Sequence, residues 1–461
     1  MTPVQVEADY LVIGAGASGL AFTDALIDHD PGARVALVDR RHGVGGHWLG
    51  AYPFVRLHQA STFYGVASTV LGGGRIQASG PEAGLHERAD QARIVGYYGD
   101  VLTDRFLASG RVELFAGCDY LGERTFVSRV SGARHEVSAR CRVVDARYLS
   151  PDIPAESAPR FAVATGARVV PVNDLARLDA APAHYVVVGS GKTATDACIW
   201  LLGRGVDPDA ITWVRPREPW MLNRALIQPE PAIYLGMVAE TMRLAASAPS
   251  LDALFLALED AGIMLRIDRS VTPTMAKAPT LGTWELDLLR TVERVVRLGH
   301  VTSVGHGRID LVDGTIVVPD DTVVVNCAAD GLKHPPLVPI WQPGTITLQP
   351  VRAGFPCFGA ALTGYVEATR PDDAAKNQVC APSSFGNSLS DWARMNVRGS
   401  ANAAAFGAAP DIAEWGAGVA LNPARIAPDH PGSAALDDAL ALLQTHSGPG
   451  QARLAELVSG R

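Results

Sequence analysis

The stretch YLVIGAGASG, residues 10–19, decides the fold that the sequence predicts. Its four apolar residues at 10–13 indicate a short buried strand, and residues 20–27 indicate a helix. Between them lie Gly14, Gly16 and Gly19 in the order G-x-G-x-x-G. Glycines in this order permit a tight turn and a close approach of the backbone to a pyrophosphate, while the helix N-terminus offers free N–H groups to the anion. The stretch therefore predicts a dinucleotide site that includes these glycines and Ser18.

Asp39 supports this prediction. A second apolar strand, residues 35–38, leads into Asp39, twenty residues after Gly19. A carboxylate at that distance can accept hydrogen bonds from a ribose. We therefore count Asp39 and the adjacent Arg40 among the cofactor contacts. The alternative interpretation is a glycine-rich turn that holds no ligand.

A second glycine motif, GSGKTA at residues 189–194, follows another apolar strand near Tyr185 and precedes another helix. A P-loop would need a glycine where Val186 stands, so the string GSGKT does not indicate nucleotide hydrolysis. The motif has the form G-x-G-x-x-A and predicts a second dinucleotide site. The expected contacts are Gly189, Ser190, Gly191, Lys192, Thr193 and Ala194.

Arg215 ends the next predicted strand, residues 211–214. An arginine where an acidic residue would otherwise hold the ribose suits a 2′-phosphate, which favours NADPH over NADH. Arg217 is a candidate to assist it. The alternative is a pair of surface arginines at a strand end.

The composition argues against several classes of protein. The chain of 461 residues has a net charge of −8, which argues against nucleic acid or an anionic membrane as a partner. It contains no apolar run of about eighteen residues and its first residues lack the features of a secretory signal, so we expect a cytoplasmic protein. Its six cysteines form no C-x-x-C pair, so we expect neither a metal site nor a dithiol redox centre.

Two dinucleotide motifs in one chain indicate electron transfer, because a nicotinamide can deliver hydride to a tightly held flavin. The sequence resembles the class B flavoprotein monooxygenases, which comprise the flavin-containing and the Baeyer–Villiger monooxygenases. The resemblance rests on both glycine motifs, GGHW at 45–48, YPFVR at 52–56, Tyr64, ATG at 164–166 and VRPREPW at 214–220. It implies FAD in the first site and NADPH in the second. It also implies an enzyme that oxygenates a small organic substrate with O2 through a C4a-(hydro)peroxyflavin.

The resemblance further implies which residues contact the flavin. Gly46, His47 and Trp48 of the GGHW run are expected there, together with Thr165 of the ATG turn. Core packing is the alternative for Trp48.

Three residues of the following loop are the candidate catalytic residues. Gln59 or His58 would hydrogen-bond near the reactive part of the flavin, and Arg56 would contact flavin or NADP. For His58, the alternative is a loop histidine whose hydrogen bonds are satisfied within the protein. For Arg56, the alternative is a structural ion pair. Arg224 is a weaker candidate for the substrate or nicotinamide side.

One departure from the family keeps other functions open. The family fingerprint F-x-G-x-x-x-H, expected just before the second glycine motif, is absent. The first alternative is an NADPH-dependent FAD oxidoreductase or oxidase that inserts no oxygen. The second is a flavoprotein that keeps FAD for structure and does not turn over.

We expect an α/β protein with two Rossmann-like dinucleotide-binding domains, the second inserted into the first. The predicted FAD domain comprises residues 1–170 and 315–461. The predicted NADPH domain comprises residues 171–314 and includes a helical insertion at 225–300. The apolar helices of this insertion are a candidate surface for a homodimer.

Overall fold

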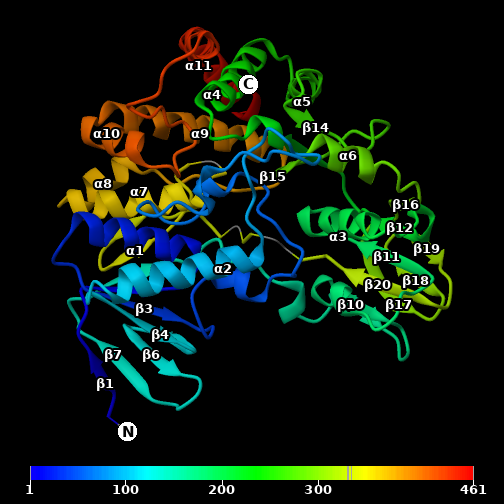
Figure 1. The fold of residues 1–461 in the computed structure, drawn as a ribbon, viewed down its shortest axis with the longest axis horizontal. Coiled ribbons are helices and arrows are strands. Elements are labelled where there is room, and N and C mark those ends of the chain that lie inside the picture. The colour runs from blue at the N-terminus through cyan, green and yellow to red at the C-terminus, as the bar shows by residue number, and fades with distance from the viewer. Residues whose placement is uncertain (1, 330–331, 334, 353, 460–461) are drawn as a thin grey trace.

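A computed structural model describes residues 2–329, 332–333, 335–352 and 354–459. Two α/β units lie side by side in Figure 1, and a layer of helices covers one end of both. The two glycine motifs each fall between a strand and a helix, as predicted. The fold is therefore the α/β class with two Rossmann-like units and a helical insertion that the sequence indicates.

The first unit is built around a mostly parallel sheet of order β21-β22-β8-β2-β3-β4. Two of its inner strands, at 10–13 and 35–39, are almost wholly buried because other elements cover both faces of the sheet. The strands are β2 (Tyr10–Ile13), β3 (Val35–Asp39), β4 (Val112–Ala116), β8 (Arg142–Asp145), β21 (Trp341–Gln342) and β22 (Thr345–Thr347).

Helices and a second small sheet cover this unit. Helix α1 (Ala17–His29) packs against α7 (Pro356–Thr369), so the first and last thirds of the chain share one core. Helix α2 (Gln91–Asp100) continues as a π-helical segment, Val101–Leu107. The small sheet consists of β1 (Val4–Val6), β5 (Cys118–Gly122), β6 (Thr125–Ser128) and β7 (Arg134–Val137).

The second unit is a five-stranded parallel sheet of order β10-β20-β11-β12-β16, with α3 (Lys192–Gly203) after β11. Its strands are β10 (Val169–Pro171), β11 (His184–Val188), β12 (Ile211–Val214), β16 (Val295–Val296) and β20 (Thr322–Asn326). Strand β20 lies beyond the predicted domain boundary at 315, yet it pairs with β11 in this second sheet.

A smaller sheet completes the second unit. Its strands are β9 (Ala162–Val163), β17 (Val301–Gly305), β18 (Arg308–Leu311) and β19 (Gly314–Val317), and β18 and β19 form a hairpin.

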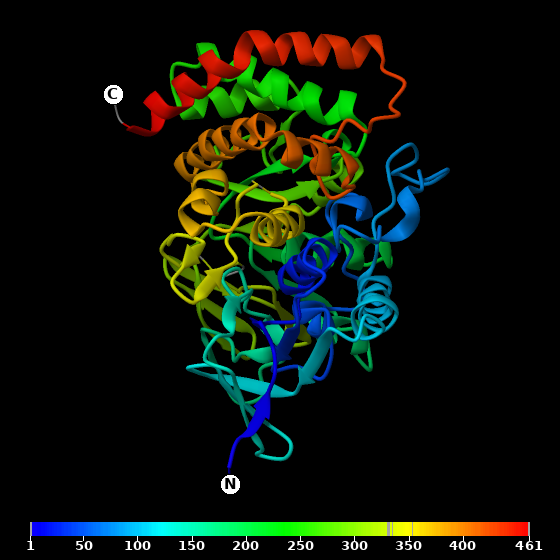
Figure 2. The same ribbon diagram turned by 90° about the vertical axis from the view of Figure 1, so that its left-hand side faces the viewer.

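The helical layer joins the inserted segment to the end of the chain. Helix α11 lies along α4 (Figure 2), and the two pack extensively. The helices are α4 (Pro231–Ser247), α5 (Leu251–Asp260), α6 (Thr283–Leu289), α8 (Asp373–Val379), α9 (Leu389–Ala408), α10 (Pro410–Gly418) and α11 (Ala434–Ser459). Among the helices of the described ranges, none combines the length and apolarity needed to cross a bilayer.

The predicted helical block is only partly helical. Strands β13 (Pro219–Asn223), β14 (Met264–Leu265) and β15 (Met275–Leu281) form a three-stranded sheet at its base. Pro273 and Pro279 fall in or beside β15, and proline removes a helical hydrogen bond and clashes with the preceding turn. Helix α6 ends at Leu289, short of the end of the predicted helical insertion at residue 300, because β16 pairs with β12.

Candidate active site

The first glycine loop has the geometry of an anion site. Gly14 has a φ of +107°, a conformation that glycine adopts without steric cost. Helix α1 begins after Gly16, which makes no side-chain cap, so no side chain occupies the N–H groups of the first turn. A Cβ on Gly46 would lie 2.9 Å from the Cα atom of Gly16, so only glycine allows this approach. Ser18, in the first turn, is partly buried.

Asp39 orders this loop from the end of β3. Its buried carboxylate accepts the N–H of Ala15 at 2.7 Å through Oδ2 and the N–H of Arg41 at 2.8 Å through Oδ1. A carboxylate has further lone pairs, so Asp39 can still accept a ribose hydroxyl. Arg40 is exposed and pairs with Glu156 at 3.2 Å, on the outside of the unit.

Thr165 belongs to the second unit, whereas the first glycine loop lies in the first. Thr165 follows β9, which pairs with β17 in the small sheet of the second unit, and its side chain is exposed. Ala146 and Arg147 border the first glycine loop: a Cβ on Gly14 would lie 3.7 Å from Ala146 Cβ and 3.6 Å from Arg147 Cγ. The reason is strand order, since β8 pairs with β2 and its carboxyl end reaches the loop.

Sequence reasoning missed Ala146 and Arg147 because the letters ATG at 164–166 match the family motif. The available signal was a strand, residues 142–145, followed at once by a small residue. Arg147 forms two hydrogen bonds to Asp145, at 2.9 and 2.8 Å, which fix its guanidinium at the strand end.

The second glycine loop repeats the geometry of the first. Gly189 has a φ of +131°, and a Cβ there would lie 3.2 Å from the carbonyl oxygen of Cys327. Helix α3 begins after Gly191, again without a side-chain cap. Trp213 Nε1 donates to the Gly189 carbonyl at 2.8 Å, which holds the turn. Ser190 and Ala194 are buried, whereas Lys192 and Thr193 are partly exposed at the start of the helix.

Arg215 lies inside the second unit, not at its surface. It is 1% exposed, stacks over the Trp213 ring at 4.6 Å and pairs with Glu218 at 3.2 Å. Burial lowers the pKa of its guanidinium, and its Nε and Nη1 atoms have no partner in the described part of the chain. Arg217, two residues later, is exposed and borders a cavity.

The loop after Gly46 connects the two glycine motifs. Its 3-10 turn, Gly46–Gly50, packs His47 on Trp48 with ring centroids 5.1 Å apart. Burial lowers the pKa of His47 to about 4. Trp48 is buried in the core and donates to the Tyr64 hydroxyl at 2.6 Å. The indole is therefore held by the protein itself, in agreement with the packing alternative.

Tyr52, further along the loop, reaches the second unit. Its hydroxyl donates to Asp196 Oδ2 at 2.6 Å, and Asp196 Oδ1 pairs with Lys192 Nζ. Burial, followed by the charge of Asp196, raises the pKa of Tyr52 well above its usual value of 10. The phenol therefore stays protonated and keeps donating.

The three candidate catalytic residues do not share one environment. Gln59 is buried, and His58 is partly buried with an Nδ1 atom that has no partner among the described residues. Burial, and then the charges of Lys192 and nearby arginines, lower the pKa of His58 to about 3. Arg56 is exposed, and its backbone bridges to Asp90 on the surface. The structure thus separates Arg56 from the other two.

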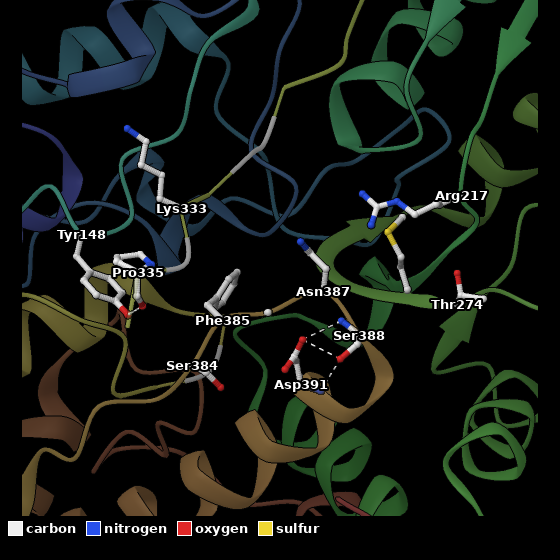
Figure 3. A pocket seen from close by; sticks show the side chains of 12 residues that line it. Tyr148, Arg217, Thr274, Lys333, Pro335, Ser384, Phe385, Asn387, Ser388 and Asp391 are labelled. Carbon is white, nitrogen blue, oxygen red and sulfur yellow. Dashed lines mark hydrogen bonds between the residues drawn. The ribbon is translucent and has the colours of Figure 1, made fainter. Parts of the chain in front are cut away.

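A cavity of about 440 Å³ opens beyond the carboxyl ends of β8, β12 and β20, where ligands bind in sheets of this kind. Figure 3 shows Arg217 and Lys333 on opposite sides of Asn387, with Phe385 between Lys333 and Asn387. Lys333 pairs with Asp152 at 3.3 Å. The lining residues are Tyr148, Arg217, Thr274, Met275, Lys333, Pro335, Ser384, Phe385, Gly386, Asn387, Ser388 and Asp391.

The described residues contain no cluster of side chains suited to bind a metal ion. Among them, no group of three or more His, Cys, Asp or Glu side chains is placed to hold an ion. All six cysteines are free and buried.

Comparisons with known proteins agree with this geometry. The NAD(P)-binding Rossmann-like domain family matches residues 12–53, which contain the first glycine loop and Asp39. An uncharacterized protein of Mycobacterium tuberculosis is 40% identical over 420 residues, which are 90% of this chain and 78% of that protein. A relative in Mycobacterium bovis matches with the same figures. The chain belongs to the family of these mycobacterial proteins.

Solved structures extend the comparison to the fold. The polycyclic ketone monooxygenase of Thermothelomyces thermophila superposes with a TM-score of 0.51 at 14% identity, covering 97% of this chain and 89% of that one. An open structure of cyclohexanone monooxygenase matches with a TM-score of 0.48 at 15% identity, covering 81% of this chain and 92% of that one. The predicted resemblance to class B flavoprotein monooxygenases is confirmed at the level of the fold.

Proposed function

We propose that this chain is an FAD-dependent monooxygenase that consumes NADPH and inserts oxygen from O2 into a small organic molecule. The observation that carries the proposal is the loop at 46–58, which touches both glycine units. Gly46 packs on Gly16 at one end of the loop, and Tyr52 hydrogen-bonds to Asp196 beside the second glycine motif. A nicotinamide bound at the second unit would thus lie next to a flavin bound at the first.

The residues of the first unit fit FAD. The uncapped N-terminus of α1 suits the pyrophosphate, and the remaining lone pairs of Asp39 suit a ribose. Gly46 and Ala146 would border the cofactor, and His47 lies in the same turn as Gly46. When bound, the flavin would supply hydride acceptance and activation of O2.

The residues of the second unit fit NADPH. The N-terminus of α3 is also without a side-chain cap, and Lys192 adds a positive charge at its first turn. Arg217 is better exposed than Arg215 to receive a 2′-phosphate, since Arg215 is enclosed and paired with Glu218. Arg215 would then support the strand end from inside, through its stacking on Trp213.

His58 and Gln59 are the side chains that we assign to the chemistry between the two cofactors. His58 stays neutral at physiological pH because its pKa is lowered to about 3, so its ring nitrogens can donate or accept a hydrogen bond without carrying a charge. Tyr52, held on Asp196, closes the loop over the start of α3 and limits the access of water. The 440 Å³ cavity would admit a molecule of ordinary metabolite size.

Two measurements on the purified protein test the proposal. Denaturation should release FAD, and anaerobic NADPH should bleach the flavin absorbance faster than NADH does. In air, a panel of ketones, sulfides and amines should include one that yields a product heavier by one oxygen atom. Bleaching of the flavin without any oxygenated product would support the oxidoreductase alternative. Bound FAD that NADPH does not bleach would support the alternative of a structural flavin. If denaturation releases no flavin, all three functions are rejected.

A further inference from the structure

Four charged side chains form a closed network inside the protein, next to the candidate catalytic residues. Two are arginines and two are glutamates, so their charges cancel. Arg88 pairs with Glu82 at 2.8 Å and with Glu285 at 3.5 Å. Arg224 pairs with Glu285 at 2.6 Å and also with Glu82. All four side chains are nearly or fully buried, with 1–6% exposure.

The network holds the backbone directly before Gln59. Arg88 Nη1 donates to the carbonyl of Leu57 at 2.9 Å, and Arg224 Nε donates to the carbonyl of His58 at 3.2 Å. The hydroxyl of Thr280 also donates to the His58 carbonyl. Two successive peptide groups are therefore fixed by guanidinium groups from different parts of the chain.

The network also joins segments that are distant in sequence. Glu82 and Arg88 come from the segment at 72–88, and Arg224 directly follows β13. Glu285 lies in the first turn of α6, where its carboxylate accepts a hydrogen bond from the N–H of Gly282 at 2.8 Å. The loop at 57–61 pairs with the end of the segment at 72–88 and the residue after it through two backbone hydrogen bonds: the N–H of Leu57 donates to the Ala89 carbonyl at 2.9 Å, and the N–H of Ser61 donates to the Glu87 carbonyl at 3.0 Å.

Stability alone does not explain such a network. Buried ion pairs often contribute no more to folding than apolar side chains of the same volume would, because removing charges from water offsets their attraction. What charged groups add is direction, since each guanidinium presents several donors in a fixed plane. The loop at 51–60 has no helix or strand of its own and needs such external support.

We propose that Arg224, together with Arg88, is a positioning residue that fixes the orientation of His58 and Gln59 by holding the two carbonyls before Gln59. The inference rests on the proposed function for the role of His58 and Gln59, but the clamp itself is independent of it. Arg224 does not line the cavity beside Arg217, so its role is indirect.

Arg224→Lys tests the clamp, because lysine keeps the charge but cannot hold both glutamates and the His58 carbonyl at once. Arg142→Lys is the matched control: Arg142 pairs with the buried Glu367 at 3.1 Å, at the start of β8 and away from the loop. Thr280→Val is a second variant that keeps all four charges: it removes the hydroxyl that donates to the His58 carbonyl and accepts from Arg224 Nε at 3.3 Å. Hydrogen exchange at the amides of Leu57 and Ser61 is the first readout, and it needs no cofactor or substrate.

We expect exchange at these two amides to rise at least tenfold in Arg224→Lys and severalfold in Thr280→Val, and to stay unchanged in Arg142→Lys. We also expect the rate of flavin reduction by NADPH to fall at least tenfold in Arg224→Lys, with KM for NADPH changed less than threefold. Unchanged exchange in both test variants, or an equal rise in the control, would overturn the clamp. Raised exchange with an unchanged reduction rate would overturn the positioning role. Absence of FAD in the wild type would instead reject the proposed function and leave the exchange result to decide the clamp.

Discussion

The hydroxyl of Tyr52 donates a hydrogen bond of 2.6 Å to Asp196, and this bond ties the first dinucleotide unit to the second. Tyr52 belongs to the loop that leaves the first glycine motif through Gly46, and Asp196 lies in the first turns of α3. A single loop thereby connects the two candidate cofactor sites. The relative position of flavin and nicotinamide would depend on it.

Tyr52→Phe should weaken this connection. Asp196 would lose one buried donor and keep Lys192, at a cost of about 2 kcal/mol in the free energy of unfolding, which urea denaturation would measure. Flavin reduction by NADPH should also slow. Tyr365→Phe is the control, because the Tyr365 hydroxyl bonds to Asp411 at 3.1 Å, a contact between α7 and α10 away from the linking loop. A similar loss of reduction rate in both variants would contradict the linking role.

Gly46→Ala should reduce the amount of FAD that copurifies with the protein. The added Cβ would lie 2.9 Å from Gly16 Cα, and the φ of +57° costs an L-residue about 1–2 kcal/mol. Gly43→Ala in the same loop adds a Cβ with nothing within 4 Å and should leave the FAD content unchanged. The ratio of flavin absorbance to protein absorbance, measured for both variants, gives the FAD content. Equal ratios would argue against a role of the close Gly46–Gly16 contact in FAD binding.

Arg217→Ala should raise KM for NADPH by tenfold or more while changing KM for NADH little, since only NADPH carries the 2′-phosphate. Arg215→Met should affect both coenzymes alike, because its guanidinium is enclosed with Glu218 and Trp213. Steady-state kinetics with the two coenzymes provide the measurement. A selective loss for NADPH in Arg215→Met alone would assign the phosphate to Arg215, as the sequence predicts.

His58 should make the protein less stable in acid. Its pKa is about 3 in the folded protein, against 6.5 for an unperturbed histidine, so between these values the unfolded chain binds a proton that the folded one does not. Stability therefore falls as the pH drops through this window, by up to about 1.4 kcal/mol per pH unit from this group. His58→Gln should reduce the slope of unfolding free energy against pH by about that amount. An unaltered slope would show that His58 is not kept neutral by burial.

The two glycine motifs could be predicted from sequence because their chemistry is local. The turn at Gly14, the strand before it and the helix after it all follow from residues within one short segment. The same holds for Gly189 and α3. Strand-to-helix turns with glycines at fixed spacing have few other structural solutions.

Features that depend on strand order or on packing could not be predicted from sequence. The ATG motif predicts Thr165 beside the flavin, and this stays a prediction. The pairing of β8 with β2 brings Ala146 and Arg147 to the first glycine loop, and no local motif predicts these two residues there. Which of the two arginines after β12 faces outward depends on how Trp213 and Glu218 pack around the strand end. The buried network around Arg224 joins segments up to about two hundred residues apart, and no local pattern predicts it.

The most direct test of the central claim is the mass of the product formed under isotopically labelled O2 with NADPH as the reductant. We expect one substrate of the panel to gain a single labelled oxygen atom, in an amount that matches most of the NADPH consumed. NADPH consumption that ends only in labelled hydrogen peroxide, for every compound in the panel, would contradict it.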